Sequence, residues 1–325
     1  MTVDPIDLVY TWVDDTWPGY GEQIARYASD RHDRNPNRTR DNLSLLKFSL
    51  RSLERHVPWA RRVFLVTCRP QIPAWLDAGS VRVVHHDEFM PSTDLPTFNS
   101  FAIVSHLHEL PGLARRFVYV EDDRLFSGPV NRDDLFDAEG RPRVFLERRH
   151  TMSPDRRDDA RLSPWNRALA ASNHLLDLRY GARRRRTAGH APLAIDTDSW
   201  RAMIAAWPDA FERTSRSRFR ATGNVAPEHL YPHFLIEERR GVEVDARETA
   251  RLVGYHPLNN VALHQRLNLA RLRARRPTFL CMNDNYGERP NERAVAVART
   301  FLERWLPDPS RFELQPRPDV GAHAR

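Results

Sequence analysis

The sequence contains few cysteines and no long apolar run. Its 325 residues include two cysteines, Cys68 and Cys281, which lie far apart and lack the spacing of metal ligands. A disulfide framework is therefore not predicted, and a reducing cytoplasm is the expected compartment. No stretch approaches the roughly 18 to 20 consecutive apolar residues that span a bilayer. The N-terminus also lacks a basic segment followed by an apolar one, so no secretory signal is predicted.

Acidic side chains are scarce relative to basic ones. The chain carries 50 Lys+Arg, nearly all of them arginine, against 43 Asp+Glu, for a net charge of +7. This excess favours anionic partners, but arginines on solvated faces would produce it equally well. The Arg-rich runs at 182–186 and 271–276 lack the regularly interleaved aromatic residues of nucleic-acid platforms, so nucleic acid is not a predicted partner. Peripheral contact with an anionic inner membrane face is a hypothesis that the basic surface leaves open.

The sequence does contain an alternation of strand-like and helix-like segments. Short β-branched and aromatic runs predict strands at 6–13, 61–67, 81–85, 116–121 and 277–284, and regular structure is expected again over 190–196. Amphipathic spacing predicts helices after Asp41 or Asn42, from Asn99 or Ser100, and over 166–178, 199–207 and 294–306. Such alternation predicts an α/β layered domain with a mostly parallel sheet.

The domain organisation follows from changes in composition. A single catalytic domain is predicted over residues 1–306. Residues 131–186, rich in Arg, Asp and Pro, are interpreted as a variable, helical, Arg-rich insertion within it. Residues 307–325 are interpreted as a Pro-rich C-terminal tail, which we expect to be frayed.

Acidic residues follow two of the predicted strands. Asp122 and Asp123 end the segment FVYVEDD, and Asp14 and Asp15 end IDLVYTWVDD. Because ligands of such sheets bind beyond the carboxyl ends of the strands, we expect both pairs to face one crevice. Aspartates at this position commonly cap a following helix. They would equally hold Mg²⁺ or Mn²⁺ on a substrate diphosphate, since hard cations bind carboxylate oxygens.

Four further residues are candidates for site chemistry. His190 in GHAP has the side chain best suited to proton transfer near neutral pH, although it could simply be packed or exposed. Asn283 and Asp284 follow a predicted strand and fit either a metal site or an Asx turn. Arg220 could neutralise phosphate or could be one more solvated arginine.

The order of these segments resembles the conserved blocks of the Stealth family. The matching stretches are IDLVYTWVD, RDNLSLLKFSLRSLERHVPWARRVFLVT, LPTFNSFAIVSHLHELPGLARRFVYVEDD, GHAPLAID and FLCMND. That family includes bacterial capsular polysaccharide phosphotransferases and the catalytic subunit of the N-acetylglucosamine-1-phosphotransferase that marks lysosomal enzymes. The resemblance covers most of residues 6–130 and shorter stretches beyond.

The resemblance implies both a fold and a reaction. The fold would be similar to the GT-A type, a Rossmann-like layer. The reaction would transfer a hexose-1-phosphate, expected to be N-acetylhexosamine-1-phosphate, from a nucleotide-sugar donor to the hydroxyl of a glycan or other acceptor. A phosphodiester would form and a nucleoside monophosphate would leave, with Mg²⁺ or Mn²⁺ as cofactor, in the synthesis of capsular, other surface or cell-wall polymers.

The family's functional residues carry over by motif. As catalytic residues the resemblance implies Asp122, Asp123, His190 and Arg220; as substrate-binding residues Tyr10, Trp12, Asp14, Arg51 and Asn99; and as metal-binding residues Asp122, Asp123, Asn283 and Asp284. Glu121 stands where the family commonly has Asn, so whether it joins the metal stays open. The acceptor proton would go to His190 or to a carboxylate that is not on the metal.

Two other functions compete with phosphotransfer. An ordinary metal-dependent GT-A glycosyltransferase would attack the sugar at C1 and release a nucleoside diphosphate. A non-catalytic binder of anionic polymer would use the basic surface and would show a steep salt dependence of binding.

Overall fold

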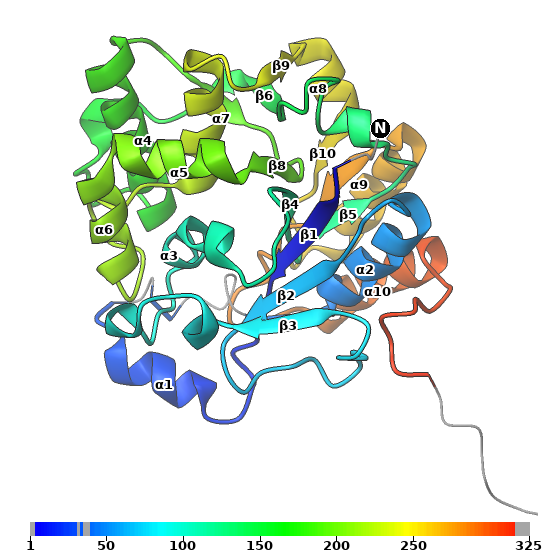
Figure 1. Ribbon diagram of the computed structural model, residues 1–325. Helices are drawn as coiled ribbons and strands as arrows, with labels where there is room; N and C mark the ends of the chain where they lie inside the picture. The colour runs from blue at the N-terminus through cyan, green and yellow to red at the C-terminus, as the bar shows by residue number, and fades with distance from the viewer. Residues whose placement is uncertain (1–3, 31–32, 35–39, 316–325) are drawn as a thin grey trace, which may run out of the picture.

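A five-stranded sheet forms the centre of the computed structural model, which describes residues 4–30, 33–34 and 40–315 (Figure 1). The strand order is β3-β2-β1-β4-β8. The strands are β1 (Ile6–Thr11), β2 (Val63–Thr67), β3 (Arg82–His85), β4 (Arg116–Glu121) and β8 (Leu193–Asp196). The first four pair in parallel, and β8 is antiparallel to β4. The predicted α/β class with a mostly parallel, mixed sheet is confirmed.

The remaining described strands form two smaller, three-stranded sheets. One has the order β10-β11-β5 and the other β7-β6-β9. Their strands are β5 (Arg124–Phe126), β6 (Arg143–His150), β7 (Arg186–Ala188), β9 (Val242–Val244), β10 (Val253–Tyr255) and β11 (Phe279–Cys281). The strand predicted over 277–284 is thus only three residues long and belongs to one of the small sheets.

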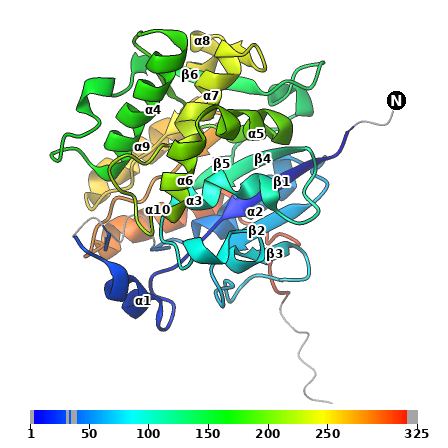
Figure 2. The same ribbon diagram turned by 60° about the vertical axis from the view of Figure 1, so that its left-hand side comes forward.

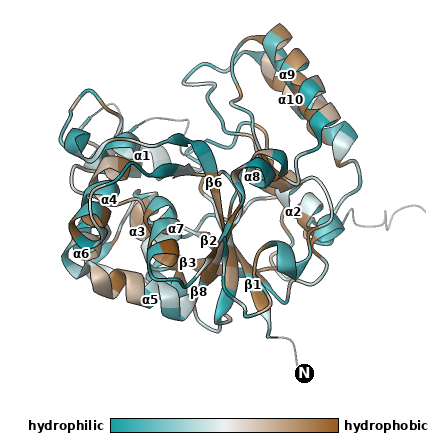
Figure 3. Cartoon of the chain, turned by 90° about the horizontal axis from the view of Figure 1, so that it is seen from above, coloured by the Kyte–Doolittle hydropathy of each residue, from teal (hydrophilic) through white to brown (hydrophobic). Residues whose placement is uncertain are grey.

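Helices cover both faces of the central sheet. They are α1 (Tyr20–Tyr27), α2 (Leu45–His56), α3 (Ser100–Ser105), α4 (Pro164–Tyr180), α5 (Thr197–Ala206), α6 (Pro208–Arg216), α7 (Pro227–Glu237), α8 (Ala246–Leu252), α9 (Ala262–Arg275) and α10 (Glu292–Trp305). Figure 2 shows α4, α5, α6 and α7 gathered on one side, and Figure 3 shows α2 on the opposite side of the strands.

Alternation of side chains along β1 explains these two layers. Val9 points into the core that α3, α5 and α7 cover, whereas Leu8 and Tyr10 point into the core that α2 covers. Successive residues of a strand face opposite sides, so an apolar run such as IDLVY must be buried on both faces.

Local capping explains where two of the predicted helices begin. Helix α3 begins where predicted, and Asn99 is its N-cap, because its side chain accepts a hydrogen bond from the Phe101 N–H. The cap predicted for α2 at Asp41 or Asn42 is wrong by two to three residues, because Ser44 is the N-cap and has a left-handed φ of 56°. Asp41 still contributes, since its Oδ1 accepts a hydrogen bond from the Leu45 N–H at 2.9 Å.

The described part of the C-terminal segment, 307–315, is packed against the domain. Phe312 is completely buried, and the Arg51 guanidinium forms two hydrogen bonds of 2.7 Å with the Glu313 carboxylate. The expectation of a frayed end is therefore wrong for these residues. The Pro-rich composition of the segment gave no sign that one aromatic side chain and one ion pair would be buried there. Residues 316–325 lie outside the described residues.

We expect Arg51→Gln to lower the free energy of unfolding by about 2–3 kcal/mol, because it leaves the buried Glu313 carboxylate without its main partner. Arg51 also donates to the Leu306 carbonyl at 2.8 Å, so the residue fastens the segment that follows α10. Urea denaturation of this variant, with the exposed Arg55→Gln on the same helix as a control, measures the effect. Unchanged stability with a tenfold higher donor KM would instead support the substrate-binding role that the resemblance implies for Arg51.

Candidate active site

A cavity of about 680 Å³ opens beyond the carboxyl ends of the central strands. Its wall includes Trp12 after β1, residues 121–124 between β4 and β5, and residues 283–285 after β11. The opposite wall comes from β6, α4, the segment before β8, and α7. Residues 143–166, inside the segment interpreted as a variable insertion, thus contribute to the cavity. A crevice beyond the strand ends was predicted to receive both acidic pairs, but only Asp122 and Asp123 line this cavity, whereas Asp14 and Asp15 do not.

The structure brings seven of the predicted site residues to this cavity: Trp12, Asp122, Asp123, His190, Arg220, Asn283 and Asp284. Four others do not line it: Tyr10, Asp14, Arg51 and Asn99. Tyr10 is buried beneath α2, where its hydroxyl accepts a hydrogen bond from Ser49 at 3.1 Å. Asn99 is buried as well and donates to the Asn224 side chain at 2.9 Å. These two side chains support the walls and do not face the cavity.

Glu121 is paired with a buried arginine. Arg124 is 8 % exposed, and its Nη2 donates to Glu121 Oε2 at 2.5 Å. It also donates to the Ala191 carbonyl, which ties the end of β4 to the segment after His190. Burial acts to raise the pKa of Glu121, but the charge of Arg124 and the nearby His190 hold it below the ordinary value. Glu121 thus remains a carboxylate that neutralises Arg124.

Asp122 and Asp123 have the opposite electrostatic environment. Burial and the neighbouring Glu121 raise the pKa of Asp123 to about 6. Burial, together with Asp123 and Asp41, raises the pKa of Asp122 well above its ordinary value. Crowded carboxylates with raised pKa values indicate a site with excess negative charge. A cation or a proton bound there would relieve that charge.

Within the described residues, Asp123 offers a free carboxylate oxygen to a magnesium or manganese ion, whereas Asn283 Oδ1 already accepts a hydrogen bond from Asn285 at 2.8 Å. Asp123 Oδ1 is buried and has no hydrogen-bond partner among the described residues, whereas Asp123 Oδ2 lies 3.5 Å from Asn283 Nδ2. Asp284 is more committed, since its Oδ2 accepts from Asn42 at 2.6 Å and its Oδ1 from the Tyr286 N–H at 2.9 Å. In the described part of the chain no three His, Cys, Asp or Glu residues are grouped to hold a metal.

His190 is a weakly basic, neutral side chain in this structure. Its ring stacks on that of Tyr255 with centroids 4.5 Å apart. Burial and the charge of Arg124 lower the pKa of His190 to about 4. At pH 7 the imidazole is therefore uncharged and is a poor match for proton uptake near neutrality.

Arg220 lies at the cavity with its charge unpaired. Its guanidinium lies 4.4 Å from the centroid of the Phe101 ring and 5.3 Å from that of Trp165, and it donates to Ser100 Oγ at 2.5 Å. No carboxylate in the described ranges forms an ion pair with it. A half-buried guanidinium held against two aromatic rings is well placed to bind a phosphate.

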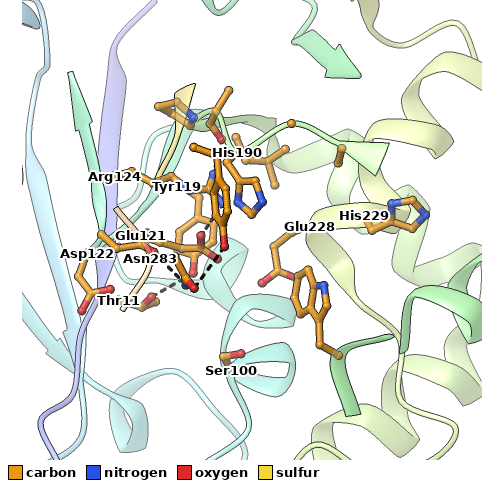
Figure 4. A pocket seen from close by; sticks show the side chains of 18 of the residues that line it. Thr11, Ser100, Tyr119, Glu121, Asp122, Arg124, His190, Glu228, His229 and Asn283 are labelled. Atoms are coloured by element: carbon orange, nitrogen blue, oxygen red, sulfur yellow. Dashed lines mark hydrogen bonds and ion pairs between the residues drawn. The ribbon is translucent and has the colours of Figure 1, made fainter. Parts of the chain in front are cut away.

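Glu228 is a site residue that the sequence analysis missed. It follows Pro227 in the first turn of α7 and is 9 % exposed. Its Oε2 is buried and without a hydrogen-bond partner in the part of the chain described. Burial and the charge of Glu121 raise the pKa of Glu228 to about 7. Figure 4 shows its carboxyl group directed toward Glu121 and Asn283, while His229 points away. Pro followed by Glu is an ordinary helix start, so the sequence carries no local signal of this role.

Family models match three parts of the chain. Stealth conserved region 2 matches residues 38–144, conserved region 3 matches 189–237 and conserved region 4 matches 270–321. These regions contain most of the cavity wall described above.

Curated relatives match nearly the whole chain. An exopolysaccharide phosphotransferase of Streptomyces coelicolor is 34% identical over 319 residues, which are 96% of this chain and 53% of the relative. The capsular polysaccharide phosphotransferase SacB of Neisseria meningitidis serogroup A is 31% identical over 325 residues, with 95% and 57% covered. The chain therefore spans about half the length of these relatives.

Solved structures resemble the chain more distantly. A galactosyltransferase, LgtC, in complex with donor and acceptor sugar analogues reaches a TM-score of 0.40 at 11% identity, covering 92% of this chain and 95% of that one. The glycosyltransferase GlyE of Streptococcus pneumoniae reaches 0.39 at 10% identity, covering 93% and 63%. We draw nothing further from similarities at these TM-scores.

Proposed function

The chain belongs to the Stealth family, and from this premise we propose that it transfers a sugar phosphate from a nucleotide sugar to an acceptor hydroxyl during polysaccharide synthesis. The names of the relatives, capsular and exopolysaccharide phosphotransferases, support this class of reaction. The observation that carries the proposal is the cavity itself, in which Asp123, Arg220 and Glu228 line one space. Phosphoryl transfer needs a site for a cation, a site for the phosphate and an acceptor for the proton. We assign these to Asp123, Arg220 and Glu228 in that order.

The donor diphosphate would bind between opposite charges. Arg220 would bind a phosphate oxygen through its guanidinium, which is held in place by Ser100 and the two aromatic rings. Asp123 and Asn283 would hold Mg²⁺ or Mn²⁺, with Asp122 as a further carboxylate close by. When bound, the cation supplies neutralisation of the charge on the diphosphate oxygens.

Glu228 is the proposed acceptor of the proton. The acceptor oxygen forms a bond to the phosphorus that carries the sugar, the bridging P–O bond breaks, and the nucleoside monophosphate leaves with that electron pair. The hydroxyl proton passes to Glu228 Oε2, which has no competing partner among residues 4–30, 33–34 and 40–315. A base with a pKa of about 7 is better matched to this task than His190 with a pKa of about 4. His190 would then help to position its own segment, which is held by the hydrogen bond from Arg124 to the Ala191 carbonyl and by the stacking of His190 on Tyr255.

The identity of the group transferred is carried over from the family. Hexose-1-phosphate, with N-acetylhexosamine-1-phosphate as the first choice, is the proposed donor group, and a glycan is the proposed acceptor. The cavity of about 680 Å³ falls within the usual range of about 300–1,000 Å³ for ligand pockets.

Incubation with a panel of nucleotide sugars, Mg²⁺ and an oligosaccharide acceptor is expected to release a nucleoside monophosphate. Separation of the nucleotides by ion-exchange chromatography measures this, with a reaction lacking the acceptor as the control for hydrolysis. Release of a nucleoside diphosphate would contradict phosphotransfer and support the alternative of an ordinary glycosyltransferase. Salt-sensitive binding of an anionic polymer without any turnover would support a binding protein.

A further inference from the structure

Helix α9 exposes large apolar side chains next to arginines. Val261, Leu263 and Leu267 are 59%, 68% and 50% exposed, and together they are half of the six large hydrophobic residues exposed in the described part of the chain. The helix sequence, ALHQRLNLARLRAR, contains four arginines and neither aspartate nor glutamate. A soluble helix normally turns its leucines inward, so the outer face of α9 requires an explanation.

The apolar and basic residues of α9 are arranged in parallel stripes. The exposed apolar side chains recur at steps of four, three and four residues: Leu263, Leu267, Ala270 and Ala274. At 3.6 residues per turn they share one side of the helix. Exposed arginines flank this stripe on both sides: Arg266 and Arg273 on one, Arg271 on the other. The buried residues Gln265, Leu269 and Leu272 lie on the opposite side.

The opposite side of α9 is already used for packing. Leu269 and Leu272 share a core cluster with Ala298 and Leu302 of α10, and the two helices lie side by side at the edge of the molecule (Figure 3). The exposed stripe therefore cannot turn inward without losing this contact. It is a fixed outer surface of the fold.

The charge of this face is not neutralised within the molecule. No ion pair joins Arg266, Arg271 or Arg273 to an acidic residue in 4–30, 33–34 or 40–315. A second copy of the same face would bring these arginines against one another, which disfavours a symmetric dimer through α9. A partner must be negatively charged and must also accept leucine side chains.

We propose that the exposed face of α9 binds an anionic lipid bilayer. Leu263 and Leu267 insert at the level of the headgroups, and the three flanking arginines contact lipid phosphates. A helix with leucines on one side and arginines beside them is the pattern of an interfacial membrane helix. Anionic lipid attracts each arginine near its surface. Among the described helices none is long and apolar enough to cross a membrane.

The position of α9 relates this contact to the cavity. Tyr255 at the end of β10 precedes α9, and Asn283 follows β11 after it; both line the cavity. Binding through α9 would thus hold the cavity near the membrane surface. The inference goes beyond the proposed function, and it does not depend on the reaction catalysed.

Co-sedimentation of the full chain with vesicles tests the proposal. The probes are vesicles of phosphatidylcholine alone and of phosphatidylcholine with phosphatidylglycerol. We expect binding only to the second, weakening steeply as the salt concentration rises. The triple variant Arg266→Gln/Arg271→Gln/Arg273→Gln should bind about a hundredfold more weakly, at about fivefold for each arginine. Leu263→Gln/Leu267→Gln, with all arginines kept, should bind at least about tenfold more weakly.

Leu178→Gln is the matched control, because Leu178 is an exposed leucine, 72% exposed, that lies on α4 and not on α9. Its vesicle binding should equal that of the unchanged chain. Circular dichroism and nucleotide release from soluble substrates establish that all variants remain folded. Absence of binding to anionic vesicles at low salt would overturn the proposal. So would binding of the two α9 variants that is as strong as that of the unchanged chain. A dimer that the leucine variant alone disrupts would also overturn it and identify a second copy as the partner.

Discussion

Asp123→Asn is expected to lower kcat by about 10²- to 10³-fold, the usual effect of removing one preorganised electrostatic group from an active site. Asp123 is half-buried, with its Oδ2 beside Cys281 and Asn283, and its buried Oδ1 is left without a partner among the residues described. An asparagine of the same shape keeps the contact with Asn283 but removes the negative charge that a cation requires.

Metal binding provides a second and independent measurement of this substitution. We expect the affinity for Mn²⁺, measured by electron paramagnetic resonance without substrate, to fall together with kcat. The free energy of unfolding should not fall, because the substitution relieves repulsion between Asp123, Asp122 and Glu121. Asp133→Asn, at an exposed aspartate, is the surface control.

Two outcomes would contradict the assignment of Asp123. A kcat within tenfold of the unchanged chain, with Mn²⁺ affinity preserved, would remove Asp123 from the metal site. A loss of stability with a parallel loss of activity would indicate that Asp123 has a structural role only. Asp122→Asn in the same assays then distinguishes which carboxylate is the main ligand.

Glu228→Gln is expected to lower kcat/KM by about 10²- to 10⁴-fold, the range of a general base. The pH profile carries the sharper signature. Because Glu228 must be deprotonated to accept the proton and its pKa is about 7, kcat/KM of the unchanged chain should fall about tenfold per pH unit below 7 and level off above it. In the variant this acidic limb should disappear.

His190→Gln is the matched control for the proton acceptor. If Glu228 is the base, this variant keeps the limb near pH 7, whatever its loss of rate. If the limb disappears in His190→Gln and persists in Glu228→Gln, then His190 is the base despite its lowered pKa. A loss below tenfold in Glu228→Gln would exclude Glu228.

The same glutamate should reduce the stability of the fold at neutral and alkaline pH. Its pKa is raised from 4.5 to about 7, so the folded state holds its proton more tightly than the unfolded chain. The free energy of unfolding therefore decreases as the pH rises from about 4.5 to about 7. Glu228→Gln removes this cost, and we expect the variant to be more stable by about 3 kcal/mol at pH 8 and nearly unchanged at pH 4. Equal stability at pH 8 would argue against a raised pKa.

Local patterns predicted the central part of this site well. The apolar runs predicted β1, β2, β3 and β4, and the rule that ligands bind beyond parallel strands indicated the edge of the sheet at which the cavity opens. The start of α3 at Ser100 agrees with the predicted start at Asn99 or Ser100, because a helix start depends on neighbours two residues away. The frayed C-terminal end was predicted wrongly, since the partner of Glu313 is Arg51, which lies 262 positions earlier in the chain.

The sequence alone was sufficient for the positions of the first four strands along the chain, the acids after β4 and the membership of the Stealth family, because each of these depends on residues near one another in the chain. The order of the strands in the sheet depended on the tertiary structure. The protonation of those acids depended on the folded chain. Burial raises the pKa of Asp123 and Glu228 and lowers the pKa of His190, and the charge of Arg124 on His190 and of Glu121 on Glu228 comes from residues far away in the chain. The exposed leucines of α9 were equally invisible in the sequence, because only packing against α10 determines which of its leucines face the solvent.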